Sequence, residues 1–245
     1  MLISGIIGAG VLLGLYILKN QRANVLALRF FAIITVIIHY SPLWVDFFTE
    51  GYAEVSSVML LPIHPCNVCM WLLLASSFIP EKNGVVARIV KEFTFWGGTV
   101  CGAIGTILNE NFGSNPTLAD YDVLKGLLSH STMVIGCILL FTAGFVKIRV
   151  FSNVISVVSG LCFFVVDGFI INTLYSIFGL EPCNSMYLLE APFSDIPWLI
   201  TPVMGILAVI FAFSVCMLFE AIALPKEERW YSKIKSHINN KKETL

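Results

Sequence analysis

The residues best suited to chemistry lie together in one apolar stretch, residues 61–71. Its polar and thiol-bearing side chains are those of His64, Cys66, Asn67 and Cys69. At membrane depth such side chains are costly, so they mark functional sites by default. Pro65 has no N–H and cannot bond back to the carbonyl of Leu61. We therefore predict a kinked, polar, thiol-bearing helix segment inside a membrane.

Cysteine and histidine together fit two chemistries, and the residues alone leave both open. The first is metal binding, with ligands from His64, Cys66, Cys69 and His130. Their spacing is compatible with zinc but lacks a second strong pair, so we expect neither a metal nor a cofactor. The second is nucleophilic catalysis. A thiol in lipid resists ionisation, so a nearby His must take its proton before it attacks an ester carbonyl and holds the acyl group as a thioester.

Other polar side chains are suited to support such a reaction. Asp167 or Asn172 would orient the imidazole, and Asn67 or Asn109 would donate to the oxyanion. The structural alternative is that Asp167 and Asn172 join helices by hydrogen bonds. Most of the cysteines fit a packing role in apolar runs. The motifs of soluble hydrolases, zinc proteases and nucleotide-binding proteins do not occur.

The composition indicates an all-α, polytopic membrane protein. Of the 245 residues, 57% are hydrophobic and 13% are charged, and the mean hydropathy is +0.85. A soluble domain carries roughly 25% charged residues. Several apolar runs reach about 20 residues, which is the length needed to cross the hydrocarbon. The net charge of −1, with no basic stripe, gives no reason to expect nucleic acid as a partner.

The apolar runs predict seven transmembrane helices in a single domain, residues 1–224, followed by a basic cytoplasmic tail, residues 225–245. The runs cover about 2–18, 25–40, 57–79, 92–108, 124–145, 154–178 and 198–224. The tail suits a short amphipathic helix at the headgroups, with Trp230 and Tyr231 as interfacial anchors.

Lys and Arg concentrate in alternate loops and in the tail. This pattern predicts that the N-terminus lies outside and the C-terminus inside. Polar residues of the second to sixth spans then converge on the outer half of the bilayer, with Asp167 near the middle, and the inner halves are nearly free of such groups. The residues of this outer level are His39, His64, Cys66, Asn67, Asn109, His130, Asn172 and Tyr175.

At these residues the chain resembles the YwaF family of bacterial integral membrane proteins, which includes eukaryotic relatives of transmembrane protein 164. The segment from Leu61 to Asn67 is similar to the family's L-P-x-H-x-C motif, and His130 to its membrane histidine, although Ser131 follows where Gly is usual. Asn172, Gly179 and residues 184–188 are similar to its N-x-x-x-G-x-N-Y-M-Y-L ending. Here Ser185 replaces the first Tyr of that motif, and residues 181–183 stand inside it.

The resemblance implies an acyltransferase or transacylase that moves acyl chains between phospholipids, with Cys66 as nucleophile and His130 as base. His64, Asn67, Asn109, Asp167 and Asn172 would support this pair. The expected partners are membrane lipids, either phospholipid or lysophospholipid, and the expected location is a bacterial cell membrane. The alternative is a small-solute transporter or a non-enzymatic accessory subunit, in which the same polar residues line a solute path.

Overall fold

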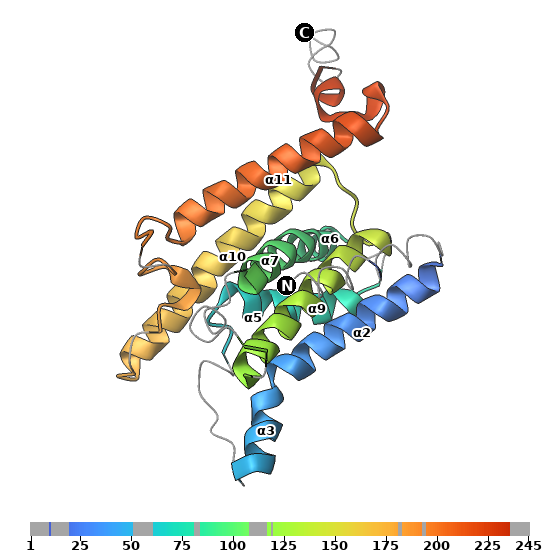
Figure 1. Ribbon diagram of the computed structural model, residues 1–245. Coiled ribbons are helices and arrows are strands. Elements are labelled where there is room, and N and C mark those ends of the chain that lie inside the picture. The colour runs from blue at the N-terminus through green and yellow to red at the C-terminus, as the bar shows by residue number, and fades with distance from the viewer. Residues whose placement is uncertain are drawn as a thin grey trace.

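The regular elements of the described part of the chain are all helical, and no strand occurs there (Figure 1). The computed structural model describes residues 10, 20–50, 61–80, 84–107, 117–118, 120–180, 183–192 and 195–235. The predicted first span, Asn109 and the last residues of the tail lie outside these ranges.

Four helices are long and apolar enough to cross a bilayer. They are α2 (Gln21–His39), α9 (Tyr121–Thr142), α10 (Val150–Ile177) and α11 (Thr201–Ala223). Each coincides with one of the predicted spans, and the chain is an all-helical membrane protein. The total of seven spans and the orientation stay predictions.

The predicted third span, 57–79, is wrong at its start. Helix α5 runs only from Pro65 to Phe78, 14 residues, and residues 61–64 are not helical. His64 is extended, with φ −103° and ψ 149°, because a proline disfavours the helical conformation of the residue before it. The missing N–H of Pro65 costs nothing in the first helical position. Pro65 therefore begins the helix instead of kinking it, and His64 is its N-cap.

A continuous helical stretch covers the predicted fourth span. It consists of α6 (Val85–Phe93), the π-helical turn η1 (Thr94–Gly98) and α7 (Thr99–Ile107). The π turn brings Gly97 and Gly98 against Cys69 of α5, and Gly98 also against Cys137 of α9. A side chain at Gly98 would overlap the Cys137 sulfur, so this glycine allows three helices to meet closely.

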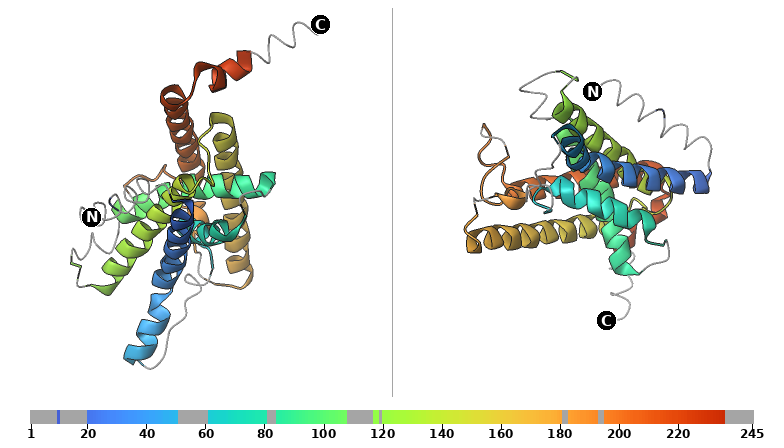
Figure 2. Two further views of the ribbon diagram at one scale, coloured as in Figure 1. Left: turned by 90° about the vertical axis from the view of Figure 1, so that its right-hand side faces the viewer. Right: turned by 90° about the horizontal axis from the view of Figure 1, so that it is seen from below.

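Helices α2 and α9 pack side by side, and α10 packs against α11 (Figure 1). The first pair is antiparallel, as three hydrogen bonds between the helices and their ends show. Asn24 Nδ2 donates to the Thr142 carbonyl at 3.3 Å, Thr35 Oγ1 to Thr132 Oγ1 at 2.9 Å, and the Ser41 and Tyr121 hydroxyls are 2.6 Å apart. Helix α3 (Ser41–Glu50) projects at one end of the molecule and the segment after α11 at the other (Figure 2). We call these the α3 end and the tail end.

The tail end contains a buried polar network. The expectation that the inner halves of the second to sixth spans are nearly free of polar groups is therefore wrong. Buried Glu92 accepts hydrogen bonds from Ser152 Oγ at 2.7 Å and Ser156 Oγ at 2.6 Å. Buried Glu220 accepts from the Val150 N–H at 2.8 Å and the Trp230 N–H at 2.7 Å. These hydroxyls and free helix N–H groups make buried carboxylates tolerable.

Candidate functional site

Two segments that are distant in the sequence meet at the start of α5. The Ile63 carbonyl accepts hydrogen bonds from Ser185 Oγ at 3.1 Å and from the Met186 N–H at 2.8 Å. Ile63, Ser185 and Met186 are each fully buried. The first and last motifs of the sequence comparison, residues 61–67 and 184–188, therefore form one structural unit.

The loop at residues 184–188 has an unusual backbone. Asn184, Met186 and Tyr187 have φ of 45°, 55° and 52°, the left-handed region that costs an L-residue about 1–2 kcal/mol. The side chain of Asn172 holds the loop, since its Oδ1 accepts from the Ser185 N–H at 2.8 Å and its Nδ2 donates to the Ser185 carbonyl at 3.3 Å. Such conformations persist where the surroundings over-determine them, as at many binding sites.

Cys66 occupies the second position of α5, in the first turn of the helix. Its side chain is half-buried, and its Sγ lies 3.4 Å from Asn67 Oδ1. The backbone amides of Cys66 and Asn67 also interact with this sulfur. The N-terminus of a helix favours negative charge, so this position suits a thiolate and, later, an oxyanion. His64 stacks on Tyr187 with ring centroids 5.4 Å apart and an interplanar angle of 25°.

Cys69 lies deeper in the protein, among other thiols. It is fully buried and interacts with Cys101 of α7 and Cys137 of α9. Within the described residues, no group of three or more His, Cys, Asp or Glu side chains has an arrangement that would hold a metal ion. Of the two α5 cysteines, Cys66 is the more exposed.

His130 lies in the first half of α9 with a defined tautomer. Its Nδ1 is 2.8 Å from the Gly126 carbonyl oxygen. A carbonyl only accepts, so Nδ1 carries the proton and the neutral ring keeps a lone pair on Nε2. The ring rests on α7 at Gly105, where a β-carbon would lie 2.5 Å from Nε2 and from Cδ2. The imidazole is therefore positioned by α7 as well as by its own helix.

No hydrogen bond joins Cys66 to His130, but both residues lie near α7. Cys101 is within electrostatic range of the Cys66 thiol, and the His130 ring packs on Gly105. These two α7 positions are four residues apart, which is about 6 Å along a helix axis. Both residues therefore lie near the same stretch of α7, and their action as a catalytic pair stays a prediction.

The predicted supporting residues have different surroundings. Asn172 is occupied by the loop at residues 184–188 and also accepts from Cys183 Sγ at 3.4 Å. Gly126, which the sequence predictions omitted, orients the imidazole in place of Asp167 or Asn172. Asp167 is half-buried, and its Oδ2 is buried without a hydrogen-bond partner.

One further histidine, His39, belongs to the same region. It ends α2, and its charge interacts with those of Lys125, His130 and His64. Its Nε2 is buried without a hydrogen-bond partner. The sequence placed His39 at the same membrane level, but its position at the end of a predicted span suggested no specific role.

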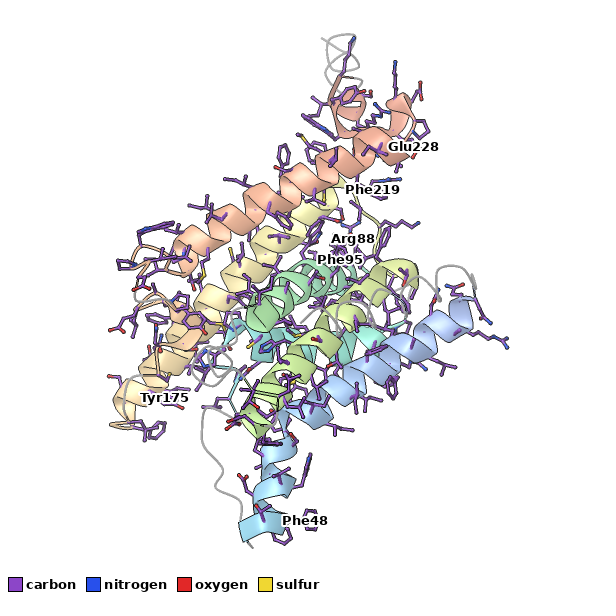
Figure 3. All side chains as sticks on the ribbon, in the orientation of Figure 1. Phe48, Arg88, Phe95, Tyr175, Phe219 and Glu228 are labelled. Carbon is purple, nitrogen blue, oxygen red and sulfur yellow. The ribbon has the colours of Figure 1, made fainter. Side chains whose placement is uncertain are left out.

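A pocket of about 400 Å³ opens beside the loop at residues 184–188. Its lining is mostly apolar, with the polar groups supplied by Asn172 and Ser176, and it includes Gly179, Leu180 and Leu189. Figure 3 labels the adjacent Tyr175 near the C-terminal end of α10, and Phe48 on α3. The pocket therefore belongs to the α3 end, like Cys66 and His130.

The fold and these contacts define an integral membrane protein in which thiol, imidazole and amide side chains gather at one end of a helical assembly. The sequence model of the TMEM164 family matches residues 1–222, and the chain belongs to this family. The resemblance found in the motifs is thereby confirmed. Searches of curated proteins and of solved structures found no match.

Proposed function

We propose that the protein is a membrane-embedded acyltransferase or transacylase that moves phospholipid acyl chains through a thioester on Cys66. The observation that carries the proposal is the placement of a half-buried cysteine at the N-terminus of α5, inside a unit built from the two segments, residues 61–67 and 184–188, that carry the motif resemblance. We further propose seven spans, an outside N-terminus, an inside C-terminus and a bacterial cell membrane as the location.

In the first half-reaction, Nε2 of His130 takes the thiol proton of Cys66, either directly after a side-chain rotation or through a bridging water. The thiolate attacks the ester carbonyl of a phospholipid. The backbone amides at the start of α5 and the Asn67 side chain stabilise the oxyanion. The intermediate collapses to a thioester on Cys66, and the lysophospholipid leaves as an alcohol with the proton returned by His130.

In the second half-reaction, the hydroxyl group of an acceptor lysolipid or alcohol attacks the thioester. His130 takes the hydroxyl proton, the new ester forms, and the proton passes back to the departing Cys66 thiolate. Atoms and charges balance without a cofactor. A buried site that excludes water favours transfer over hydrolysis.

A thioester-trapping experiment tests the proposal. The purified protein is incubated with a phospholipid that carries an alkyne-tagged acyl chain, and neutral hydroxylamine is used to release thioester-bound label. We expect label on Cys66, none on Cys66→Ala, and undiminished label on the matched variant Cys69→Ala. His130→Gln should slow labelling by about 10²-fold or more, the usual contribution of a general base. Label that survives Cys66→Ala would exclude the thioester.

The transport alternative rests on Asp167, whose buried and unpartnered oxygen suits a solute path through the membrane. It predicts solute flux into vesicles without covalent labelling, and loss of that flux in Asp167→Asn. Labelling of Cys66 together with unaltered vesicle permeability in Asp167→Asn would reject it.

A further inference from the structure

We infer that His39 and Lys125, with His130 beside them, form a subsite for a phosphate oxyanion at the α3 end. The inference rests on the proposed function only in taking a phospholipid headgroup as the source of that phosphate. Neither residue belongs to the motifs that carry the family resemblance.

The packing of α2 against α9 places His39 beside Lys125. Thr35 bonds to Thr132 at 2.9 Å, and Ser41 is 2.6 Å from the Tyr121 hydroxyl. His39 lies between these two contacts along α2, so it lies alongside the segment of α9 between Tyr121 and Thr132. Lys125 and His130 both lie in that interval.

The packing of α2 against α5 places the same histidine near the thiol. Arg29 Nε donates to the Ser77 carbonyl at 3.3 Å, and the Tyr40 and Trp71 rings are 5.9 Å apart. These contacts make α2 and α5 antiparallel, so the end of α2 reaches the first half of α5, where Cys66 lies. In a phospholipid only a few bonds separate the phosphate from the ester carbonyls. A phosphate near His39 would therefore bring an ester to Cys66.

Basic side chains gather in this region, which suits an anion. Lys125, His130 and His64 all lie within electrostatic range of His39. Lys125 has one acidic neighbour on its own helix, Asp122, whose exposed carboxylate lies 3.2 Å from Lys125 Nζ. The Lys125 ammonium also lies 6.0 Å from the centroid of the Tyr121 ring. Buried Nε2 of His39 has no hydrogen-bond partner, and a phosphate oxygen would supply one.

The experiment is a binding comparison in a phosphate-free maltoside detergent. The probes are a monoacyl lysophospholipid, the monoacylglycerol with the same chain, and inorganic phosphate. We expect the lysophospholipid to bind about tenfold or more tightly than the monoacylglycerol, the ratio that a charge-assisted hydrogen bond provides. His39→Gln and Lys125→Gln should bring the ratio close to one, Lys125→Arg should retain it, and Arg22→Gln, at the other end of α2, should leave it unchanged.

The probe arms distinguish the sources of the phosphate. If inorganic phosphate competes with the lysophospholipid, and His39→Gln abolishes the competition, the subsite recognises phosphate itself. If only the lysophospholipid binds, the subsite recognises a phosphate presented by a lipid. Equal affinities for the two lipids together with no phosphate effect would overturn the inference. All measurements are repeated in Cys66→Ala, where preserved selectivity shows that the subsite exists even if the thioester chemistry does not.

Discussion

Replacing Gly105 by alanine displaces the ring of His130, the proposed base, without changing the imidazole itself. The added β-carbon would lie 2.5 Å from both Nε2 and Cδ2 of His130 and 2.8 Å from Cε1. These distances are far inside van der Waals contact, and three ring atoms are affected at once. The ring is held at its other side by the hydrogen bond from Nδ1 to Gly126. The imidazole therefore has to rotate away, or α7 has to move from α9.

The expected magnitudes follow from these two responses. Overpacking of this kind costs about 1–3 kcal/mol in the free energy of unfolding. Displacement of a catalytic group by about 1 Å lowers the rate by roughly 10²-fold. In a His130→Ala background the ring is absent, so Gly105→Ala should cost little there. The coupling energy between the two substitutions should then be about 1–2 kcal/mol, within the range for residues in contact.

The assay is a double-mutant cycle on unfolding in detergent, combined with the rate of thioester formation on Cys66. The matched control is Gly136→Ala, whose β-carbon would lie 2.8 Å from Cδ2 of the flexible Leu73 side chain. The control should show no coupling to His130→Ala and an unchanged labelling rate. If Gly105→Ala destabilises the protein equally with and without the His130 ring, the contact between them is refuted. The cycle does not require the protein to be an enzyme.

Two further predictions concern packing and the loop. Gly160→Ala should lower the free energy of unfolding by more than about 3 kcal/mol, because its β-carbon would overlap the buried Phe93 ring. Gly205→Ala, whose β-carbon would lie 3.5 Å from its nearest neighbour, should change it by no more than about 0.5 kcal/mol. Similar thermal unfolding midpoints for the two variants would contradict the packing of α10. Asn172→Ala should lower stability by about 1–3 kcal/mol and speed amide hydrogen exchange at Ser185, because it removes both bonds to that residue. Unchanged exchange at Ser185 would show that the conformation of the loop at residues 184–188 does not depend on Asn172.

The membrane-spanning helices could be predicted because an apolar run of sufficient length leaves the backbone no alternative in lipid. The start of α5 could not be placed in the same way. Residues 57–79 are hydrophobic on average, and hydropathy does not register that His64 precedes a proline. Because of steric exclusion at that one residue, α5 begins at Pro65, eight positions after the predicted start at residue 57. A proline in an apolar run is compatible with a kink inside a helix and with the start of one, and hydropathy does not distinguish the two.

The candidate site was predictable only in part. The common level of Cys66 and His130 follows from the places of both residues in their spans. The acceptor for Nδ1 of His130 cannot be predicted in this way. An imidazole on a helix can bond either to the carbonyl four residues earlier or to a residue distant in the sequence. The buried Glu92 near a predicted helix end gave no signal either. Its partners Ser152 and Ser156 lie some 60 residues further along the chain, and their contact depends on how α6 packs against α10.

The site lies at helix ends for a physical reason. In the middle of a membrane helix every backbone N–H and carbonyl is paired within the helix, so the backbone can offer nothing to a substrate. At the start of a helix this pairing is incomplete, and in α5, which begins at Pro65, the backbone amides of Cys66 and Asn67 interact with the Cys66 sulfur. The same break leaves the carbonyl of Ile63 unpaired by any helix, and Ser185 and Met186 supply its donors. The loop at residues 184–188 thus satisfies the carbonyl that precedes α5, and loosening Asn172 should disturb the surroundings of Cys66 without a direct contact between the two side chains.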